Sequence, residues 1–180
     1  MERTVAYVSE HGSASVSLRT LAAAIGSSPR VLLYLFGSKE GLLTEVFGVC
    51  RQRQLDLLNG ALDATDDPDE AMWRLWRSWL ADPGRAGLMR LFFEIYLHSL
   101  QGACPYGDFA SASVYQWLDI LGPMNDEEPD DRVRSTLTLA VLRGLLLDAL
   151  ATNDTERVER ALRHYLDQSR GSGAPGQPAE

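Results

Sequence analysis

Cysteine and histidine are scarce in this chain of 180 residues, which contains two cysteines and three histidines. Cys50 and Cys104 form no CxxC pair, so the sequence predicts neither a disulfide framework nor a zinc site, and we expect both thiols to be buried structural groups. The histidines, His11, His98 and His164, are scattered along the chain. We therefore expect no metal site and no cofactor.

Motifs that mark common enzyme active sites are also missing. The sequence has no G-x-S-x-G nucleophile elbow, no phosphate-binding glycine loop and no paired-histidine metal motif. We therefore assign no catalytic residue and expect a protein that is not an enzyme.

Long uninterrupted hydrophobic runs are rare as well. The N-terminal residues MERTVAYVSEHG lack the apolar core of a signal peptide. The most apolar later run, 137–151, contains Arg143 and Asp148 and is too short to span a bilayer. These features predict a cytoplasmic protein with no membrane-spanning segment.

Positive charge is deficient overall, because 25 acidic side chains outnumber 17 basic ones and the formal net charge is -8. The deficit is confined to one part of the chain. Residues 1–53 carry six basic and four acidic side chains, a balance of +2, whereas the remaining residues have a balance of -10. An acidic body repels DNA, so the N-terminal segment is the part that we expect to approach a nucleic acid.

The sequence does contain a compact helix-turn-helix pattern, SLRTLAAAIGSSPRVLLYLFGSKEGLL. Ser17 caps a first helix whose apolar residues recur at spacings of three and four, and Gly26 ends it. A second helix of about two turns, capped by Ser27 or Ser28, follows over 29–35. Such a pattern is typical of proteins that place the second helix against DNA.

A third helix begins directly after this pattern. Ser38 caps it, and Lys39 and Glu40 occupy its first turn. The positive end of the helix dipole favours Glu40 and disfavours Lys39. A DNA phosphate close to Lys39 would account for the cation at this position.

The run from Leu18 to Leu43 resembles the DNA-binding domain of the tetracycline-repressor (TetR) family of transcriptional regulators. This resemblance covers about the first fifty residues, and the rest of the chain fits the family in length and helical pattern. It implies an all-α homodimer with an N-terminal three-helix helix-turn-helix domain at 1–47 and a C-terminal helical effector-binding and dimerisation domain at 48–170. A glycine- and proline-rich tail at 171–180 is expected to be disordered.

The resemblance also implies a function and a set of DNA contacts. The two DNA-binding domains of the dimer, called its heads below, would bind a near-palindromic double-stranded DNA operator. A small-molecule effector would spread the heads and release the DNA. The contacts would be Ser17 and Arg19 at the backbone and groove edge, Ser28, Pro29, Arg30 and Val31 at the base-facing helix start, and Lys39 at a phosphate. Arg30 is our candidate for reading a base, since a guanidinium binds guanine bidentately, and the alternative is a solvated surface arginine.

Two departures from the family pattern stand out. Leu33 replaces the usual phosphate-binding tyrosine, and Leu35 replaces a histidine or aromatic residue. Tyr34 can offer its hydroxyl to a phosphate, but its side chain points about 100 degrees around the helix from that of residue 33. The segment before Gly12 is also shorter than the family's first helix and lacks a basic arm. Either the true start lies upstream or the DNA affinity is modest. Leu33 and Leu35 motivate an alternative, the same fold with decayed DNA reading, acting as a ligand- or partner-binding module.

The remaining sequence predicts a series of helices and no persuasive strand. They are expected at about 39–64, at 68–80, over 88–100 after a break at Pro83 and Gly84, around Tyr115 and Trp117 up to Gly122 and Pro123, at about 130–152 and at 154–168. The helix at 130–152 is apolar almost all round, so a second face must be covered. In the family the partner subunit covers it in a four-helix bundle of the last two helices, where Gly144 would allow close approach. The alternative is burial within one subunit.

Aromatic side chains cluster on the segments that would line the family's central cavity. Such walls suit an apolar or aromatic effector, and they also suit an ordinary core. Arg143, a charge in an apolar helix, would either hold an anionic ligand group or pair with Glu94 or Asp148, and we favour the ion pair. The residues assigned to the effector site are Trp73, Trp76, Phe92, Phe93, Tyr96, Trp117 and Arg143.

Overall fold

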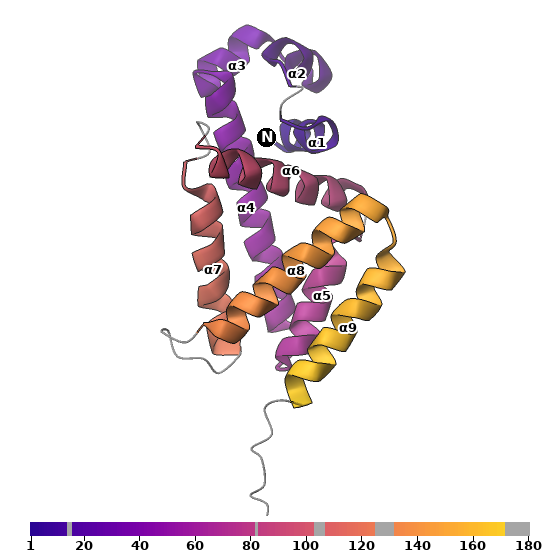
Figure 1. Ribbon diagram of the computed structural model, residues 1–180. Coiled ribbons are helices and arrows are strands. Elements are labelled where there is room, and N and C mark those ends of the chain that lie inside the picture. The colour runs from indigo at the N-terminus through magenta and orange to yellow at the C-terminus, as the bar shows by residue number, and fades with distance from the viewer. Residues whose placement is uncertain (14–15, 82, 103–106, 125–131, 172–180) are drawn as a thin grey trace, which may run out of the picture.

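The computed structural model describes residues 1–13, 16–81, 83–102, 107–124 and 132–171. These residues form α-helices and no strand, which confirms the all-α prediction (Figure 1). The helices are α1 (Glu2–His11), α2 (Leu18–Ile25), α3 (Pro29–Phe36), α4 (Lys39–Asp63), α5 (Pro68–Trp79), α6 (Pro83–Leu100), α7 (Phe109–Met124), α8 (Val133–Thr152) and α9 (Thr155–Gly171). The predicted tail lies outside the described residues, apart from Gly171.

Side-chain caps fix the helix boundaries of the N-terminal domain where the sequence predicts them. The Oγ of Ser17 accepts from the Thr20 backbone N–H at 3.1 Å, and the Thr20 hydroxyl oxygen accepts in return from Ser17 N–H. Ser28, rather than its neighbour, caps α3 by accepting from Val31 N–H at 3.2 Å. Gly26 has φ 75°, a left-handed conformation that glycine adopts without strain and that ends α2.

α6 joins the N-terminal domain to the rest of the protein. It crosses beneath α1 (Figure 1), and its Leu91 and Ile95 complete the hydrophobic core of the N-terminal domain. A side chain on Gly87 would bring its Cβ within 2.9 Å of the Ser9 carbonyl oxygen, so glycine permits the close contact of α6 with α1.

A second core fills the C-terminal domain. It is built from buried side chains of α5, α6, α7, α8 and α9, with Leu58 and Ala61 from the end of α4. Trp76 lies at its centre and is fully buried. The long helix α4 therefore starts in one core and ends in the other, which ties the two domains together (Figure 1).

Two of the predicted helix boundaries are wrong, and proline is the reason in both. α6 begins at Pro83 instead of after it, because a proline at the first helical position lacks only an N–H that has no helical partner there. α7 continues through Gly122 and Pro123 to Met124, because a proline in the last turn removes a single hydrogen bond.

By length and composition α8 could cross a membrane, although the shorter run 137–151 was expected to be too short. About 33% of its most apolar window is buried in the protein. Leu139, Leu142 and Leu146 form this buried side and pack in the core of the C-terminal domain. The structure thus uses α8 as a core helix that keeps one open apolar side.

Cys50 gives the protein a titratable group that should affect stability at high pH. The side chain is 7% exposed, and burial raises the pKa of its thiol from 9.0 to about 11, against the lowering effect of Arg53. Because the unfolded thiol ionises first, the free energy of unfolding should fall as the pH rises from about 9 to 11. Urea unfolding of the parent chain and a Cys50→Ala variant measures this, and equal pH slopes would contradict it. Cys104 lies outside the described residues.

Candidate DNA-binding surface and effector cavity

α3 presents its predicted contact residues to solvent. Pro29, Arg30 and Val31 are exposed at the start of the helix, and Tyr34 is 88% exposed. Leu32 is the buried residue that anchors this helix in the core of the N-terminal domain. The exposed residues of α3 therefore lie at the end of the molecule that carries α2 and α3 (Figure 1).

The flanking helix ends carry the remaining predicted contacts. Arg19 is exposed in the first turn of α2, beside the cap residue Ser17, whose oxygen is engaged with Thr20. Lys39 is half-buried in the first turn of α4 and is the single lysine of the chain. Since α3 packs on both α2 and α4, all eight predicted residues lie in one region of the N-terminal domain.

Leu33 and Leu35 add an apolar character to this surface. They are 47% and 61% exposed, so neither is part of the core. Neither side chain can donate a hydrogen bond to a phosphate, whereas both can make apolar contact with a thymine methyl group in the major groove.

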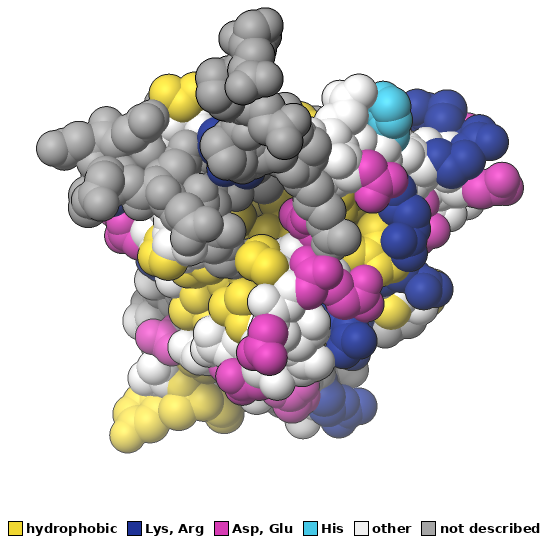
Figure 2. Space-filling model, turned by 90° about the horizontal axis from the view of Figure 1, so that it is seen from below, with side chains coloured by type: hydrophobic (Ala, Val, Ile, Leu, Met, Phe, Trp, Pro, Cys, Tyr) yellow, Lys and Arg dark blue, Asp and Glu magenta, His cyan; other side chains and the backbone are white. Residues whose placement is uncertain are grey.

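The face of the molecule opposite the N-terminal domain carries both acidic and basic side chains (Figure 2). Asp and Glu side chains are spread over the end of the molecule opposite the N-terminal domain, with basic side chains gathered along one edge (Figure 2). The acidic segment that ends α4 and leads into α5, with the exposed Asp63, Asp66 and Asp67, belongs to the C-terminal domain. This domain would be repelled by DNA, which favours an approach through α3.

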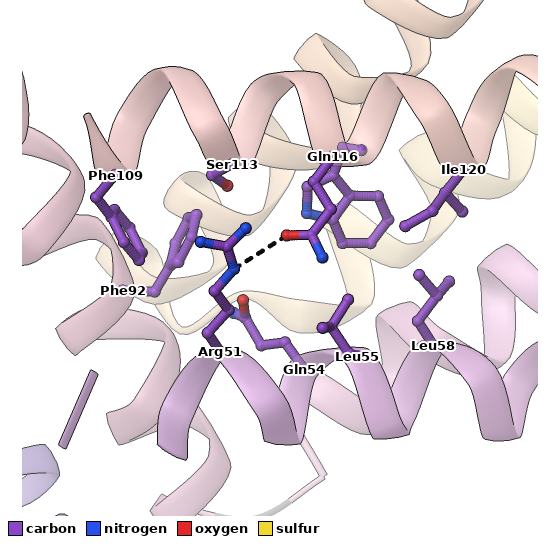
Figure 3. A pocket seen from close by; sticks show the side chains of 10 residues that line it. Arg51, Gln54, Leu55, Leu58, Phe92, Phe109, Ser113, Gln116 and Ile120 are labelled. Carbon is purple, nitrogen blue, oxygen red and sulfur yellow. Dashed lines mark hydrogen bonds between the residues drawn. The ribbon is translucent and has the colours of Figure 1, made fainter. Parts of the chain in front are cut away.

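Three small cavities lie between α4, α5, α6, α7 and α8, and all of them border Phe92 and Gln54. Each has an open space of about 20 Å³, which is room for about one water molecule. One of the three lies between α4 and α7, where the guanidinium of Arg51 extends toward Gln116 and its Nε donates to Gln116 Oε1 at 3.1 Å (Figure 3).

Some of the predicted effector residues border these cavities and others do not. Phe92, Phe93, Trp117 and Arg143 line them, and Tyr96 is hydrogen-bonded to Arg143. The structure places the two remaining residues, Trp73 and Trp76, in the core and away from the described cavities. Trp76 is fully buried, and the Trp73 ring lies against α9, 3.7 Å from the guanidinium carbon of Arg163.

Arg143 does not form the ion pair that the sequence favours. Its Nη1 donates to the Tyr96 hydroxyl at 3.1 Å, and its Nη2 donates to the Ser113 hydroxyl at 3.0 Å. The guanidinium also lies 4.8 Å from the Tyr96 ring centre. Burial lowers the pKa of Arg143 from its ordinary value, and its interactions with Tyr96 oppose this shift.

Helix geometry explains why both expected acidic partners are elsewhere. Glu94 is two positions from Tyr96 on α6, so it points to the opposite side, where its carboxylate accepts from Ser13 N–H at 3.0 Å and from the Ser13 hydroxyl at 2.7 Å. Asp148 is five positions from Arg143 and binds Arg157 through two hydrogen bonds of 2.6 and 2.9 Å.

Several cavity residues were not predicted. They include Arg51, Gln54, Phe109, Ser113 and Gln116. Of these, Arg51 carries a signal that sequence reasoning could have used. It stands between Phe47 and Leu55 at helical spacings of four, so a charge interrupts an apolar side of α4 in the same way that Arg143 interrupts α8.

Comparison with known proteins agrees with this geometry. Residues 1–46 match the model of a family described as bacterial regulatory proteins, tetR family. No curated protein matches the chain. The fold is similar to that of a transcriptional regulator from Rhodococcus sp. Rha1, with a TM-score of 0.79, 18% identity and 98% of each chain covered. It is also similar to the TetR family transcriptional regulator PfmR from Thermus thermophilus, with a TM-score of 0.58, 20% identity, and 93% of this chain and 94% of that chain covered. The N-terminal domain therefore belongs to the TetR family of bacterial regulatory proteins, and the chain as a whole has the fold of solved transcriptional regulators.

Proposed function

We propose that this protein is a dimeric, ligand-responsive transcriptional regulator that acts as a repressor in the cytoplasm. α3 enters the DNA major groove, and two copies bind half-sites of a palindromic operator about one helical turn apart. The observation that carries this proposal is the solvent-exposed start of α3, with Arg30 and Val31 accessible on a helix that Leu32 anchors.

The open side of α8 supports a dimer. Val133, Leu137 and Leu147 are 64%, 56% and 48% exposed. Together with the exposed Ala140, Gly144 and Ala151 they form the α8 stripe, in which residues alternate at spacings of four and three as in helix bundles. A Cβ on Gly144 would meet no atom within 4 Å, so the stripe leaves space for a partner helix there. A second copy of the chain, packing α8 and α9 on their equivalents, would cover this stripe.

α6 offers a route from the effector cavity to the DNA. Its Phe92 and Phe93 border the cavities, and Leu91 belongs to the core of the N-terminal domain. Ile95 belongs to that core and also borders one of the cavities. A ligand that displaces Phe92 would move α6, and the contacts of α6 with α1 would pass this movement to α3. Two heads that no longer match the half-site spacing would release the operator.

Arg30 and Lys39 should differ in their effect on operator binding. Arg30→Ala is expected to cost about 1 to 3 kcal/mol at one base position and to relax specificity there, because a guanidinium contact to guanine is lost. Lys39→Ala should weaken binding to all sequences and reduce the slope of log affinity against log salt by about one, because a phosphate contact is lost.

Operator selection from a random DNA pool, followed by fluorescence anisotropy at several salt concentrations, measures both effects. Single-base variants of the selected operator show whether the Arg30→Ala loss is confined to one position. The same response from both variants would contradict these roles.

The exposed Leu33 and Leu35 favour one alternative, a ligand- or partner-binding module whose DNA reading has decayed. The same selection separates the two functions. Enrichment of a palindrome supports the regulator, whereas a folded dimer that enriches no sequence supports the module.

A further inference from the structure

The cavity region holds two arginines that have no acidic partner among the described residues. Arg51 extends from α4 and donates to the side-chain oxygen of Gln116, as Figure 3 shows. Arg143 extends from α8 and donates to the hydroxyls of Tyr96 and Ser113. Ser113 also lines the cavity that Arg51 borders, so the two cations share one lining residue.

Several other arginines are paired with carboxylates. They are Arg53 with Glu2, Arg74 with Glu70, Arg132 with Asp119, and Arg157 with Asp148 and Asp154. The partners of Arg51 and Arg143 are neutral oxygens instead. A partly buried cation without a counter-charge is costly, and an anion that reached both guanidiniums would relieve this cost.

The walls around these arginines are aromatic. Phe92 and Trp117 each border two or more of the cavities, and Phe109 stands beside Phe92 with ring centres 5.7 Å apart. Because each cavity has room for about one water molecule, a larger ligand must displace side chains and join the cavities. Phe92 borders all three, and the flexible Met89 borders two, so these side chains are suited to that adjustment.

We propose that the effector is an aromatic carboxylate, whose carboxylate binds the guanidiniums of Arg51 and Arg143 and whose ring packs against Phe92 and Trp117. Guanidinium and carboxylate groups match in geometry and form charge-assisted hydrogen bonds. The inference rests on the proposed function, because it names the chemical class of the ligand to which the regulator responds.

The test uses the full chain and three aromatic carboxylates, namely benzoate, 2-naphthoate and 4-biphenylcarboxylate, each beside its neutral carboxamide. Binding is followed by quenching of tryptophan fluorescence, since Trp79 and Trp117 line the cavities, and by the shift in the melting temperature. At least one carboxylate should bind about tenfold or more tightly than its carboxamide, as expected for loss of a charged hydrogen bond. Equal affinity of each pair, or no binding by any of the three carboxylates, would overturn the proposal.

Arg51→Gln and Arg143→Gln should each reduce carboxylate affinity about tenfold or more while leaving carboxamide affinity unchanged. Arg74→Gln, which removes a surface ion pair, is the matched control and should bind as the parent chain does. Arg143→Met tests for a purely structural role of the cation. Its melting temperature should equal or exceed that of the parent chain, because an uncompensated charge is removed. A lower melting temperature, or full carboxylate affinity in the glutamine variants, would overturn the assignment.

Operator binding is measured on the same preparations without ligand, so that the two proposals can fail separately. Carboxylate binding by a chain that selects no DNA supports the proposed ligand class and excludes the proposed function as a DNA-binding regulator. Operator binding without carboxylate binding supports the regulator and overturns the inference.

Discussion

Leu147→Asp is expected to convert the proposed dimer to monomers and to weaken operator binding about 100-fold, because the two DNA-binding domains would no longer be linked. Leu147 is 48% exposed in the second half of the α8 stripe. An aspartate there would place an unpaired carboxylate in the proposed interface, where it would lose hydration. Sedimentation velocity measures the oligomeric state, and fluorescence anisotropy with the selected operator measures the affinity.

Leu100→Asp is the matched control for this experiment. Leu100 is more exposed, at 65%, and lies at the end of α6, outside the α8 stripe. The control should remain dimeric and retain operator affinity. If Leu147→Asp also remained dimeric with full affinity, the α8 stripe would not be the dimer interface.

Trp76→Ala should destabilise the protein by about 3 to 5 kcal/mol, the usual cost of removing a large aromatic side chain from a core. Trp76 is fully buried and borders none of the described cavities. The loss should therefore appear in the free energy of unfolding, measured with urea, and not in the ligand affinity of the folded fraction.

Two further variants keep this prediction testable even if Trp76→Ala does not fold. Trp76→Phe should cost less, because it leaves a smaller cavity and removes an indole N–H that has no hydrogen-bond partner among the described residues. Trp117→Ala changes a half-buried side chain that lines two cavities, so it should alter ligand binding more than stability. A Trp76→Phe variant with weakened ligand binding and unchanged stability would show that Trp76 belongs to the ligand site and not to the core.

The N-terminal domain could be predicted in detail because its helix boundaries are local. Each boundary depends on a side chain that bonds to a backbone N–H a few residues away, as with Ser17, Ser28 and Ser38. The open side of α8 could also be anticipated from the sequence. The spacing of the apolar residues shows a helix that is apolar almost all round, and one neighbouring helix cannot cover all of that surface.

The surroundings of the cavity could not be predicted, because they depend on contacts between distant helices. Arg143 meets Tyr96 and Ser113, which are 47 and 30 residues away. Which acidic side chain it could reach depended on the rotation of α6, and that rotation turns Glu94 toward Ser13. For the same reason the sequence could not separate the aromatic residues of the cavity walls from Trp73 and Trp76 of the core.

The shared position of α6 has a consequence for how the protein folds. Leu91 and Ile95 fill the core of the N-terminal domain although they lie more than forty residues beyond its end in the sequence. A fragment containing only residues 1–47 would expose the apolar surface that these two side chains cover. We therefore expect the N-terminal domain to fold as part of one cooperative structure, because its core is complete only when α6 of the C-terminal part is present.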